Sequence, residues 1–380
     1  MANVGKSTFF QAITKSELGN PANYPFATIT PEEARVIVPS DKLDHLYQLF
    51  QSENKIPANL KIFDIAGLVR GASNGSGLGN QFLNDIRQVD GIFQVVRAFI
   101  DDEITHVEGK VDPVRDLTVI IDELLLKDME FVENSLEKLQ KELKNKNRKQ
   151  PGDLMNLELE IKTLEKCYEW LMEGKRIANY ENWSNEEIEI LNTHNLLTAK
   201  PCVYLINCNE KDYASKTNQF IPEIKQWISE NSPNSPFIIF SAAFETQFNK
   251  LSSDKKELSQ YLNALNVEES ALPKIISAMR DSLNLISFYT CGDVEARQWT
   301  IRKGIKAIDA AGVIHSDLQN TFINAQIMKF CDLINLSAPF DEKLIKSQGK
   351  QLKVGKNYII EDGDVVFFNA AAAKSKKVKR

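Results

Sequence analysis

The sequence is poor in the residues that build disulfide and metal scaffolds, and it has no long apolar run. Its 380 residues include five cysteines and four histidines. The cysteines are odd in number, widely spaced and form no CxxC pair, which argues against a disulfide framework or a zinc site. No stretch approaches the roughly 20 apolar residues of a membrane-spanning helix, and no signal-peptide pattern opens the chain. These absences predict a soluble, cytoplasmic protein.

Charge is spread unevenly along the chain. The hydrophobic content of 43% and charged content of 26% are those of an ordinary folded protein, with room for two or three domains. The net charge is -6, yet the last seven residues, Lys374 to Arg380, carry five positive charges. A solvated tail is the simpler interpretation, and a nucleic-acid or nuclear-import role is the alternative.

Short apolar runs alternate with helical stretches in residues 1–113 and again in residues 200–282. This alternation predicts an α/β fold with a parallel sheet covered by helices. The expected strands are Ala34–Val38, Leu60–Phe63, Ile92–Val96, Cys202–Ile206 and Phe237–Phe240.

Between these blocks, residues 114–199 show two heptad seams that predict an inserted antiparallel coiled-coil hairpin. The seams are separated by a polar break from Lys144 to Asp153 that contains Pro151-Gly152. They consist of Leu125, Met129, Val132, Leu136, Leu139 and Leu143, then Leu157, Ile161, Leu164, Tyr168 and Leu171. A local helical subdomain without a partner surface is the alternative, so the sequence leaves the function of the hairpin open.

The pattern changes once more in residues 283–369, which predict a small separate α+β domain, followed by the basic tail 370–380. Asp362-Gly363 lies between two β-rich runs, a typical signal for a β-hairpin.

The chain opens with the second half of a phosphate-binding loop, G-x-x-x-x-G-K-[ST], directly before an apolar helical stretch. The residues are Asn3, Val4, Gly5, Lys6, Ser7 and Thr8. Gly5 lets the backbone wrap a β-phosphate, Lys6 neutralises β/γ charge and Ser7 offers an oxygen to Mg²⁺. The first glycine of the motif would fall before Met1, and so would the preceding strand.

Two further elements agree with this loop. Asp64-Ile65-Ala66-Gly67 follows an expected strand, where P-loop hydrolases place a carboxylate on magnesium through water and a glycine N–H on the γ-phosphate. Thr28 stands where a switch segment would offer a second magnesium ligand, with Thr30 as the competing candidate and an ordinary turn residue as the simpler alternative.

Asn207-Cys208-Asn209-Glu210 ends another expected strand, where guanine-reading proteins carry Asn-Lys-x-Asp. Cys208 replaces the lysine, and Glu210 is one methylene longer than aspartate. Adenine lacks the two guanine donors that the aspartate accepts, so the changes predict a preference for ATP over GTP. Backbone N–H groups of Ser241, Ala242 and Ala243 are placed to contact the base.

With these residues in hand, the chain resembles the YchF family, the Obg-like ATPases among the translation-factor-related P-loop GTPases. The resemblance covers nearly the whole length. It includes residues 64–72, Gly77-Leu78-Gly79-Asn80, residues 104–109, residues 296–304 and residues 310–315.

The resemblance implies a nucleotide-binding domain interrupted by a coiled-coil arm, a C-terminal β-grasp (TGS) domain, Mg²⁺-dependent ATP hydrolysis and action on ribosomes or in translation. It implies magnesium ligands Ser7 and Thr28. The implied nucleotide contacts are Asn3 to Thr8, Thr28 to Glu32, Asp64 to Leu68, Phe99, Asn207, Cys208 and Ser241 to Ala243. The chain departs from the family in lacking the first strand and leading glycine, which suggests a truncated gene model or a degraded site.

Hydrolysis needs a group that orients the attacking water, and Leu68 cannot do so where many relatives of the superclass carry glutamine. His106, on a polar loop after the strand Ile92–Val96, is the candidate catalytic residue beside Lys6, and a surface histidine without a role is the alternative.

Two rival functions remain. One is a nucleotide-gated interaction protein with little turnover, acting on a ribosome. The other is an RNA-binding module using Arg297, Arg302, Lys303 and Lys306, against which stands the acidic overall charge.

Overall fold

The computed structural model describes residue 1 and residues 3–15, 33–65, 86–101, 103–104, 109–144 and 151–371. These residues form two compact units. Unit 1 holds the described residues among 1–15, 33 and 63–275, and unit 2 holds those among 34–62 and 276–371. The domain boundaries given above remain a prediction.

A parallel sheet in the order β4-β5-β6 forms the centre of unit 1. Its strands are β4 (Ile92–Arg97), β5 (Cys202–Asn207) and β6 (Phe237–Phe240), so the three strands expected here are confirmed. Every residue of β5 is buried, as expected for a central strand that is covered on both faces.

Helices cover both faces of this sheet. On one face Leu117 of α4 (Pro113–Lys144) and Trp227 of α8 (Ile221–Asn231) share a core cluster with Tyr204 of β5. On the other, Phe9 of α1 (Lys6–Lys15) packs edge-on against Phe93 and Phe240. Because successive strand residues point to opposite faces, these contacts define a three-layer α/β/α arrangement.

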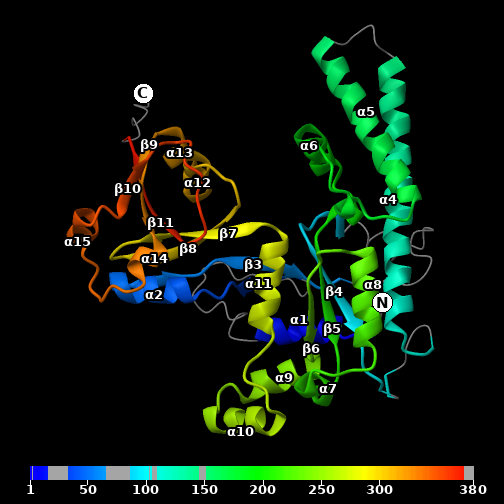
Figure 1. Cartoon of the computed structure of the whole chain (residues 1–380), viewed down its shortest axis with the longest axis horizontal. Coiled ribbons are helices and arrows are strands. Elements are labelled where there is room, and N and C mark those ends of the chain that lie inside the picture. Colours follow the sequence, from blue (N-terminus) through cyan, green and yellow to red (C-terminus); the bar gives the residue numbers. More distant parts are fainter. Residues whose placement is uncertain are drawn as a thin grey trace, which may run out of the picture. The chain divides into compact units, whose positions relative to one another are not determined.

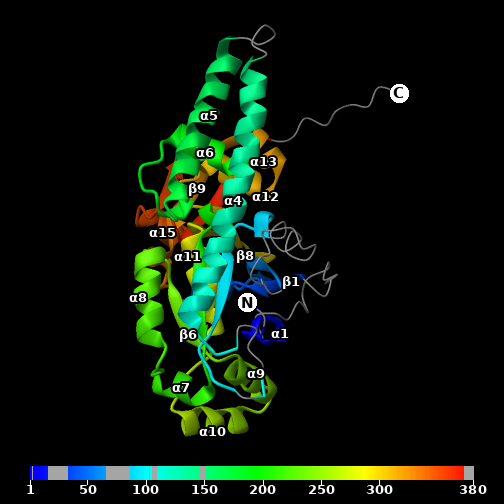
Figure 2. The ribbon, with the colours of Figure 1, turned by 90° about the vertical axis from the view of Figure 1, so that its right-hand side faces the viewer.

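The helical hairpin predicted from the heptads is confirmed. Helix α4 packs along α5 (Pro151–Met172), and both views show the two helices side by side (Figures 1 and 2). Leu125, Val132, Leu164 and Leu171 lie in one buried cluster. The second helix begins at Pro151, so Pro151-Gly152 opens α5 and does not belong to the break. Proline is favoured in the first turn of a helix, where its missing N–H has no partner to lose.

Unit 1 also contains shorter elements among the described residues. They are η4 (Ile177–Asn179), α6 (Asn185–His194), η5 (Leu197–Ala199), α7 (Glu210–Ser215), α9 (Ala242–Leu251) and α10 (Lys255–Leu265). Helix α11 (Leu272–Ser282) runs from unit 1 into unit 2. No helix among the described residues is both long enough and apolar enough to cross a membrane.

Unit 2 is built on a mixed six-stranded sheet in the order β10-β9-β11-β7-β8-β2. The strands are β2 (Asn54–Ile56), β7 (Leu285–Cys291), β8 (Glu295–Arg302), β9 (Phe322–Lys329), β10 (Gln351–Val354) and β11 (Asp364–Ala370). A separate pair joins β1 (Glu33–Ile37) and β3 (Asn59–Phe63), which confirms the first two expected strands as strands. Among the described residues they do not pair with the parallel sheet β4-β5-β6, to which the sequence pattern assigns them.

Helix α2 (Asp41–Phe50) packs against the sheet of unit 2, although it lies in the N-terminal part of the sequence. Leu43, Leu46 and Leu49 share a buried cluster with Tyr289 and Val365. A second cluster brings together residues of α12 (Ala307–Ile314), β9 and β11. Further helices in the described part of unit 2 are α13 (Ser316–Asn320), α14 (Phe330–Leu333) and α15 (Glu342–Ser347).

The β-hairpin predicted at Asp362-Gly363 is wrong. Strand β11 pairs antiparallel with β9 and parallel with β7, and the run before it forms only an isolated bridge at Ile359. The turn is tied to β7, because the Asp362 carboxylate accepts the Ser287 N–H at 2.9 Å and Gly363 donates its N–H to the Ser287 carbonyl at 2.8 Å.

Candidate functional site

The half phosphate loop leads directly into α1. Helix α1 begins at Lys6, with exposed Ser7 and Thr8 in its first turn. The first N–H groups of a helix have no intrahelical partner, so this end attracts anions. Asn3 adopts a positive φ of 56°, and Val4 is buried. The predicted phosphate contacts therefore lie together at one helix end.

Gly5 is required by close packing. Its φ is +97°, and a Cβ at this position would clash with the side-chain amide of Asn207. Any other residue would have both a strained backbone at this φ and a steric clash with Asn207, which explains why the loop has glycine here.

Asn207, at the end of β5, joins three segments of the chain. Its Nδ2 donates to the Val4 carbonyl at 3.0 Å, and its Oδ1 accepts the Ala242 N–H at 3.0 Å. The side chain is 3% exposed, so both bonds are shielded from water. Asn207 thus fixes the phosphate loop against the segment after β6, which was predicted to contact the base.

The charged groups at the phosphate end are consistent with an anion site. Partial burial lowers the pKa of Lys6, and the Asp64 carboxylate partly opposes this shift. The Lys6 ammonium donates to the Met1 carbonyl at 2.8 Å. Burial disfavours the charged form of such a lysine. A phosphate that binds beside it stabilises the ammonium, because the opposite charge raises the pKa back toward its ordinary value.

Ser7 and Asp64 suit Mg²⁺, which prefers oxygen ligands and takes the rest from phosphates and water. No group of three or more His, Cys, Asp or Glu side chains in the described part of the chain is arranged to hold a metal ion.

Several predicted site residues lie outside the described residues. They are residues 28–32, which include Thr28 and Thr30, residues 66–68, which include Gly67 and Leu68, and His106.

Cys208 and Glu210, the two positions that differ from the guanine-reading motif, have different surroundings. Cys208 is 2% exposed, its Sγ lies 3.4 Å from the Phe240 carbonyl, and burial raises the pKa of its thiol to about 12. Glu210 accepts the Tyr261 hydroxyl at 2.6 Å. The neutral thiol and the engaged carboxylate replace the lysine and free aspartate of a guanine reader.

Segment 241–243 offers less than the sequence suggested. Ser241 is fully buried, and its hydroxyl caps α9 by accepting the Phe244 N–H at 3.3 Å. The N–H of Ala242 is taken by Asn207. Ala243 is exposed in the first turn of α9.

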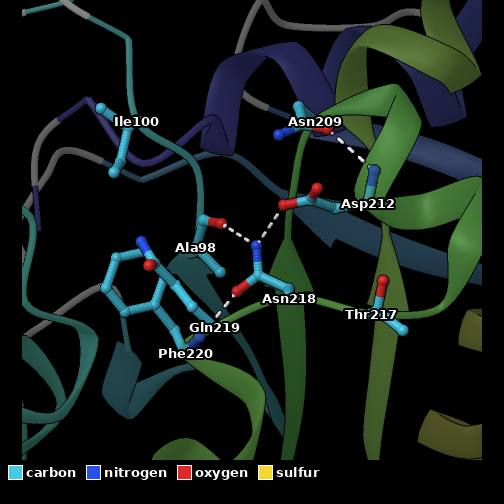
Figure 3. Close-up of a pocket in the computed structure, with 8 residues that line it drawn as sticks. All are labelled: Ala98, Ile100, Asn209, Asp212, Thr217, Asn218, Gln219 and Phe220. Atoms are coloured by element: carbon cyan, nitrogen blue, oxygen red, sulfur yellow. Dashed lines mark hydrogen bonds between the residues drawn. The ribbon is translucent and has the colours of Figure 1, made fainter.

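A polar pocket of about 490 Å³ opens at the carboxyl ends of β4 and β5 (Figure 3). In open α/β sheets ligands bind beyond these strand ends. The lining residues are Ala98, Ile100, Asn209, Asp212, Thr217, Asn218, Gln219 and Phe220. Phe99, predicted as a nucleotide contact, lies in the chain between Ala98 and Ile100.

Asn218 organises this pocket and was missed by sequence reasoning. Its Nδ2 donates to the Ala98 carbonyl at 2.7 Å and to Asp212 at 2.5 Å, and its Oδ1 accepts the Phe220 N–H at 2.9 Å (Figure 3). Asn209 caps α7 by accepting the Asp212 N–H at 2.8 Å. No motif marks Asn218, and only its place in the loop after α7 could have drawn attention to it.

Two family models match the chain. One, YchF-GTPase_C, is described as a protein of unknown function (DUF933) and matches residues 285–371, and the other, MMR_HSR1, is described as a 50S ribosome-binding GTPase and matches residues 1–148.

Full-length relatives agree with these models. The chain is 50% identical to the Obg-like ATPase homolog of Saccharomyces cerevisiae, covering 99% of this chain and 94% of that protein. It is 45% identical to human Obg-like ATPase 1, covering 100% and 93%. The structure of the Schizosaccharomyces pombe YchF GTPase superposes with a TM-score of 0.85 at 48% identity, covering 97% of this chain and 96% of that one.

The α/β fold and the phosphate-loop geometry agree with the 45–50% sequence identity that the chain shares with these relatives along almost its entire length. The protein therefore belongs to the YchF family of Obg-like ATPases.

Proposed function

We propose that this protein binds and hydrolyses ATP in preference to GTP, with Mg²⁺ as cofactor. The observation that carries the proposal is the pair of hydrogen bonds that Asn207 makes with the Val4 carbonyl and the Ala242 N–H, because they fix the phosphate loop against the segment after β6. A fixed phosphate loop suits phosphoryl transfer, since positioning and charge stabilisation supply most of its catalysis.

The preference for adenine rests on Glu210 and Cys208. Burial and the neighbouring Glu210 carboxylate raise the pKa of Tyr261, so its hydroxyl stays protonated and donates to that carboxylate. The bond to α10 holds Glu210, which is already one methylene longer than aspartate, away from the placement that would accept both guanine donors. The buried Cys208 thiol cannot pack over a base as a lysine stem does. The pocket beside Phe99 is the proposed place of the base.

In this proposal Lys6 and the first turn of α1 bind the phosphates, and Ser7, Thr28 and, through water, Asp64 would hold Mg²⁺. The ion would neutralise phosphate charge. His106 would orient the attacking water, since Leu68 has no polar group. These roles, the cytoplasmic location and the action on ribosomes, including RNA contact through the C-terminal domain, remain proposals.

Lys6→Ala tests the proposal. We expect the rate of Mg²⁺-dependent ATP hydrolysis to fall by about 100-fold or more, as when one charge-stabilising donor is removed from an active site. Lys15→Ala is the matched control, because Lys15 lies exposed in the last turn of the same helix. Equal turnover in Lys6→Ala and Lys15→Ala would refute the assignment.

One observation favours a second function, a nucleotide-gated switch with little turnover. Residues 34–62 join the stretches Thr28–Glu32 and Asp64–Leu68, both predicted to contact nucleotide, and they pack within unit 2. In this second function, nucleotide binding would act on unit 2 through the chain that connects these stretches with residues 34–62. ATP binding without product release in a single-turnover assay would favour this function over the ATPase.

A further inference from the structure

Arg97, the last residue of β4, carries a buried guanidinium that holds the loop after the strand. Its side chain is 1% exposed. Nε donates to the Phe99 carbonyl at 3.3 Å, and Nη2 donates to the carbonyls of Asp101 at 3.3 Å and Ile104 at 3.0 Å. One side chain therefore ties down three carbonyls within the seven residues that follow it.

Burying this charge is costly. Burial lowers the pKa of Arg97, and the Asp101 and Asp116 carboxylates only partly oppose the shift. Nη1 is buried without a hydrogen-bond partner among the described residues. An unsatisfied buried donor is uncommon in folded proteins and calls for a specific reason.

The guanidinium also stacks on Phe99, with its central carbon 4.6 Å from the ring centroid. Such a contact is favourable when it is shielded from water. Arg97 thereby holds both the backbone and the ring of Phe99.

The start of the loop is fixed by other groups. The Ala98 N–H donates to the Asn207 carbonyl at 2.8 Å, and its carbonyl accepts Asn218. Loss of the Arg97 side chain would therefore release Phe99 and the residues that follow it. Ala98 would keep its hydrogen bonds to Asn207 and Asn218.

We propose that Arg97 is a positioning residue of the nucleotide site, holding Phe99 for contact with the base beside the pocket that Ala98 and Ile100 line. The inference rests on the proposed function, because it takes the pocket to be where the base binds. Arg97 is not a phosphate ligand in this account, since the donors that have partners bond to backbone carbonyls. It acts on the base end of the nucleotide and leaves the phosphate end unchanged.

The test compares two ligands that share the phosphates and differ in the base. Calorimetry measures the Kd of Mg·ATP and of Mg·tripolyphosphate for the full chain, Arg97→Lys, Phe99→Ala and the double variant. We expect Arg97→Lys to weaken ATP binding by about tenfold, the scale of one base–aromatic stack, and to change tripolyphosphate binding less than about twofold. The double variant should bind ATP as Phe99→Ala does, because Arg97 acts through that ring.

Arg176→Lys is the matched control, since Arg176 is another buried arginine of unit 1 that donates to a carbonyl, that of Lys200 at 2.8 Å. It should leave both Kd values unchanged. Equal weakening of ATP and tripolyphosphate by Arg97→Lys, or a further tenfold loss in the Phe99→Ala background, would overturn the inference.

The outcomes separate this inference from the proposed function. If the unaltered chain binds no ATP, the proposed function fails. If Phe99→Ala weakens ATP and Arg97→Lys does not, only the role of Arg97 fails. Should Arg97→Lys not fold, hydrogen exchange on the unaltered chain decides: ATP should slow exchange of the amides in residues 99–101 more than tripolyphosphate does, and equal protection would contradict the proposal.

Discussion

Two buried polar side chains of unit 1 and one of unit 2 differ in the groups to which they bond. In unit 1, the Arg97 and Asn207 side chains bond to backbone atoms of loops at the strand ends. In unit 2, the Asp364 carboxylate accepts the Lys329 ammonium at 2.7 Å, the Tyr358 hydroxyl at 3.0 Å and the Glu361 N–H at 3.0 Å, so it chiefly links two other side chains. In the proposed function, the first arrangement fixes the segments that bind the nucleotide. The second stabilises a sheet.

The largest expected effect is on the first arrangement. Asn207→Ala leaves the Val4 carbonyl and the Ala242 N–H buried without their partner, at a cost of about 1–3 kcal/mol each. Because the two segments are then no longer held for the nucleotide, we expect the Kd for ATP to rise by about 100-fold. Calorimetry measures this change.

Asn179→Ala is the control, because it also removes one side-chain bond to a carbonyl, that of Asn231 at 2.9 Å, in unit 1. If both variants bound ATP equally well, Asn207 would be only a structural residue and the contrast between the units would disappear.

Asp364→Ala tests the second arrangement. The variant leaves Lys329 without its buried partner, and we expect the free energy of unfolding of unit 2 to fall by about 2 kcal/mol. This is below the range for a fully buried pair, because the Lys329 side chain is 27% exposed and keeps some water. Denaturant titration followed by tryptophan fluorescence measures it.

The affinity for ATP should not change in Asp364→Ala, and Glu361→Gln, whose exposed carboxylate lies 3.0 Å from the same ammonium, should cost less stability. A loss of ATP affinity in the Asp364 variant would break the division of roles between the units.

The smallest effect concerns acid stability. Burial raises the pKa of Asp362, but the Lys42 ammonium at 2.5 Å and the Ser287 N–H outweigh it and hold this pKa below its ordinary value of 3.8. A carboxylate with a lowered pKa stabilises the folded state above pH 3.8, and that stabilisation is lost as the pH falls through the folded value.

We therefore expect the Tm of unit 2 to fall less steeply below pH 4 in Asp362→Asn than in the unaltered chain. Asp44→Asn is the control. Asp44 lies in α2, the helix that carries Lys42, and its exposed carboxylate pairs with Lys55 instead. Parallel curves for the unaltered chain and Asp362→Asn would show that the Lys42 pair does not contribute.

The sequence predicted those features that depend on local pattern. Strands β4, β5 and β6 follow from apolar runs, and the hairpin follows from heptads because its seam residues are close in sequence. The position of Asn207 was also predictable, because it ends a strand at the expected place in a base-reading motif.

Long-range pairing was not predictable. Asn54 pairs with Glu295, so β2 joins a sheet whose other strands lie far along the chain, and no local pattern encodes that register. Asp362 and Gly363 carry the residue types of a hairpin turn, yet their bonds to Ser287 direct the chain beside β7. Arg97 and Asn218 belong to no motif, and only folding reveals which carbonyls they reach.

The most direct test of the central claim is a calorimetric titration of the full chain with Mg·ATP and Mg·GTP. The account predicts that ATP binds at least about tenfold more tightly, because Tyr261 holds the longer Glu210 side chain and Cys208 is buried, so the two guanine donors find no carboxylate placed as the aspartate of a guanine reader is. Equal affinity for the two nucleotides, or tighter binding of GTP, would contradict it.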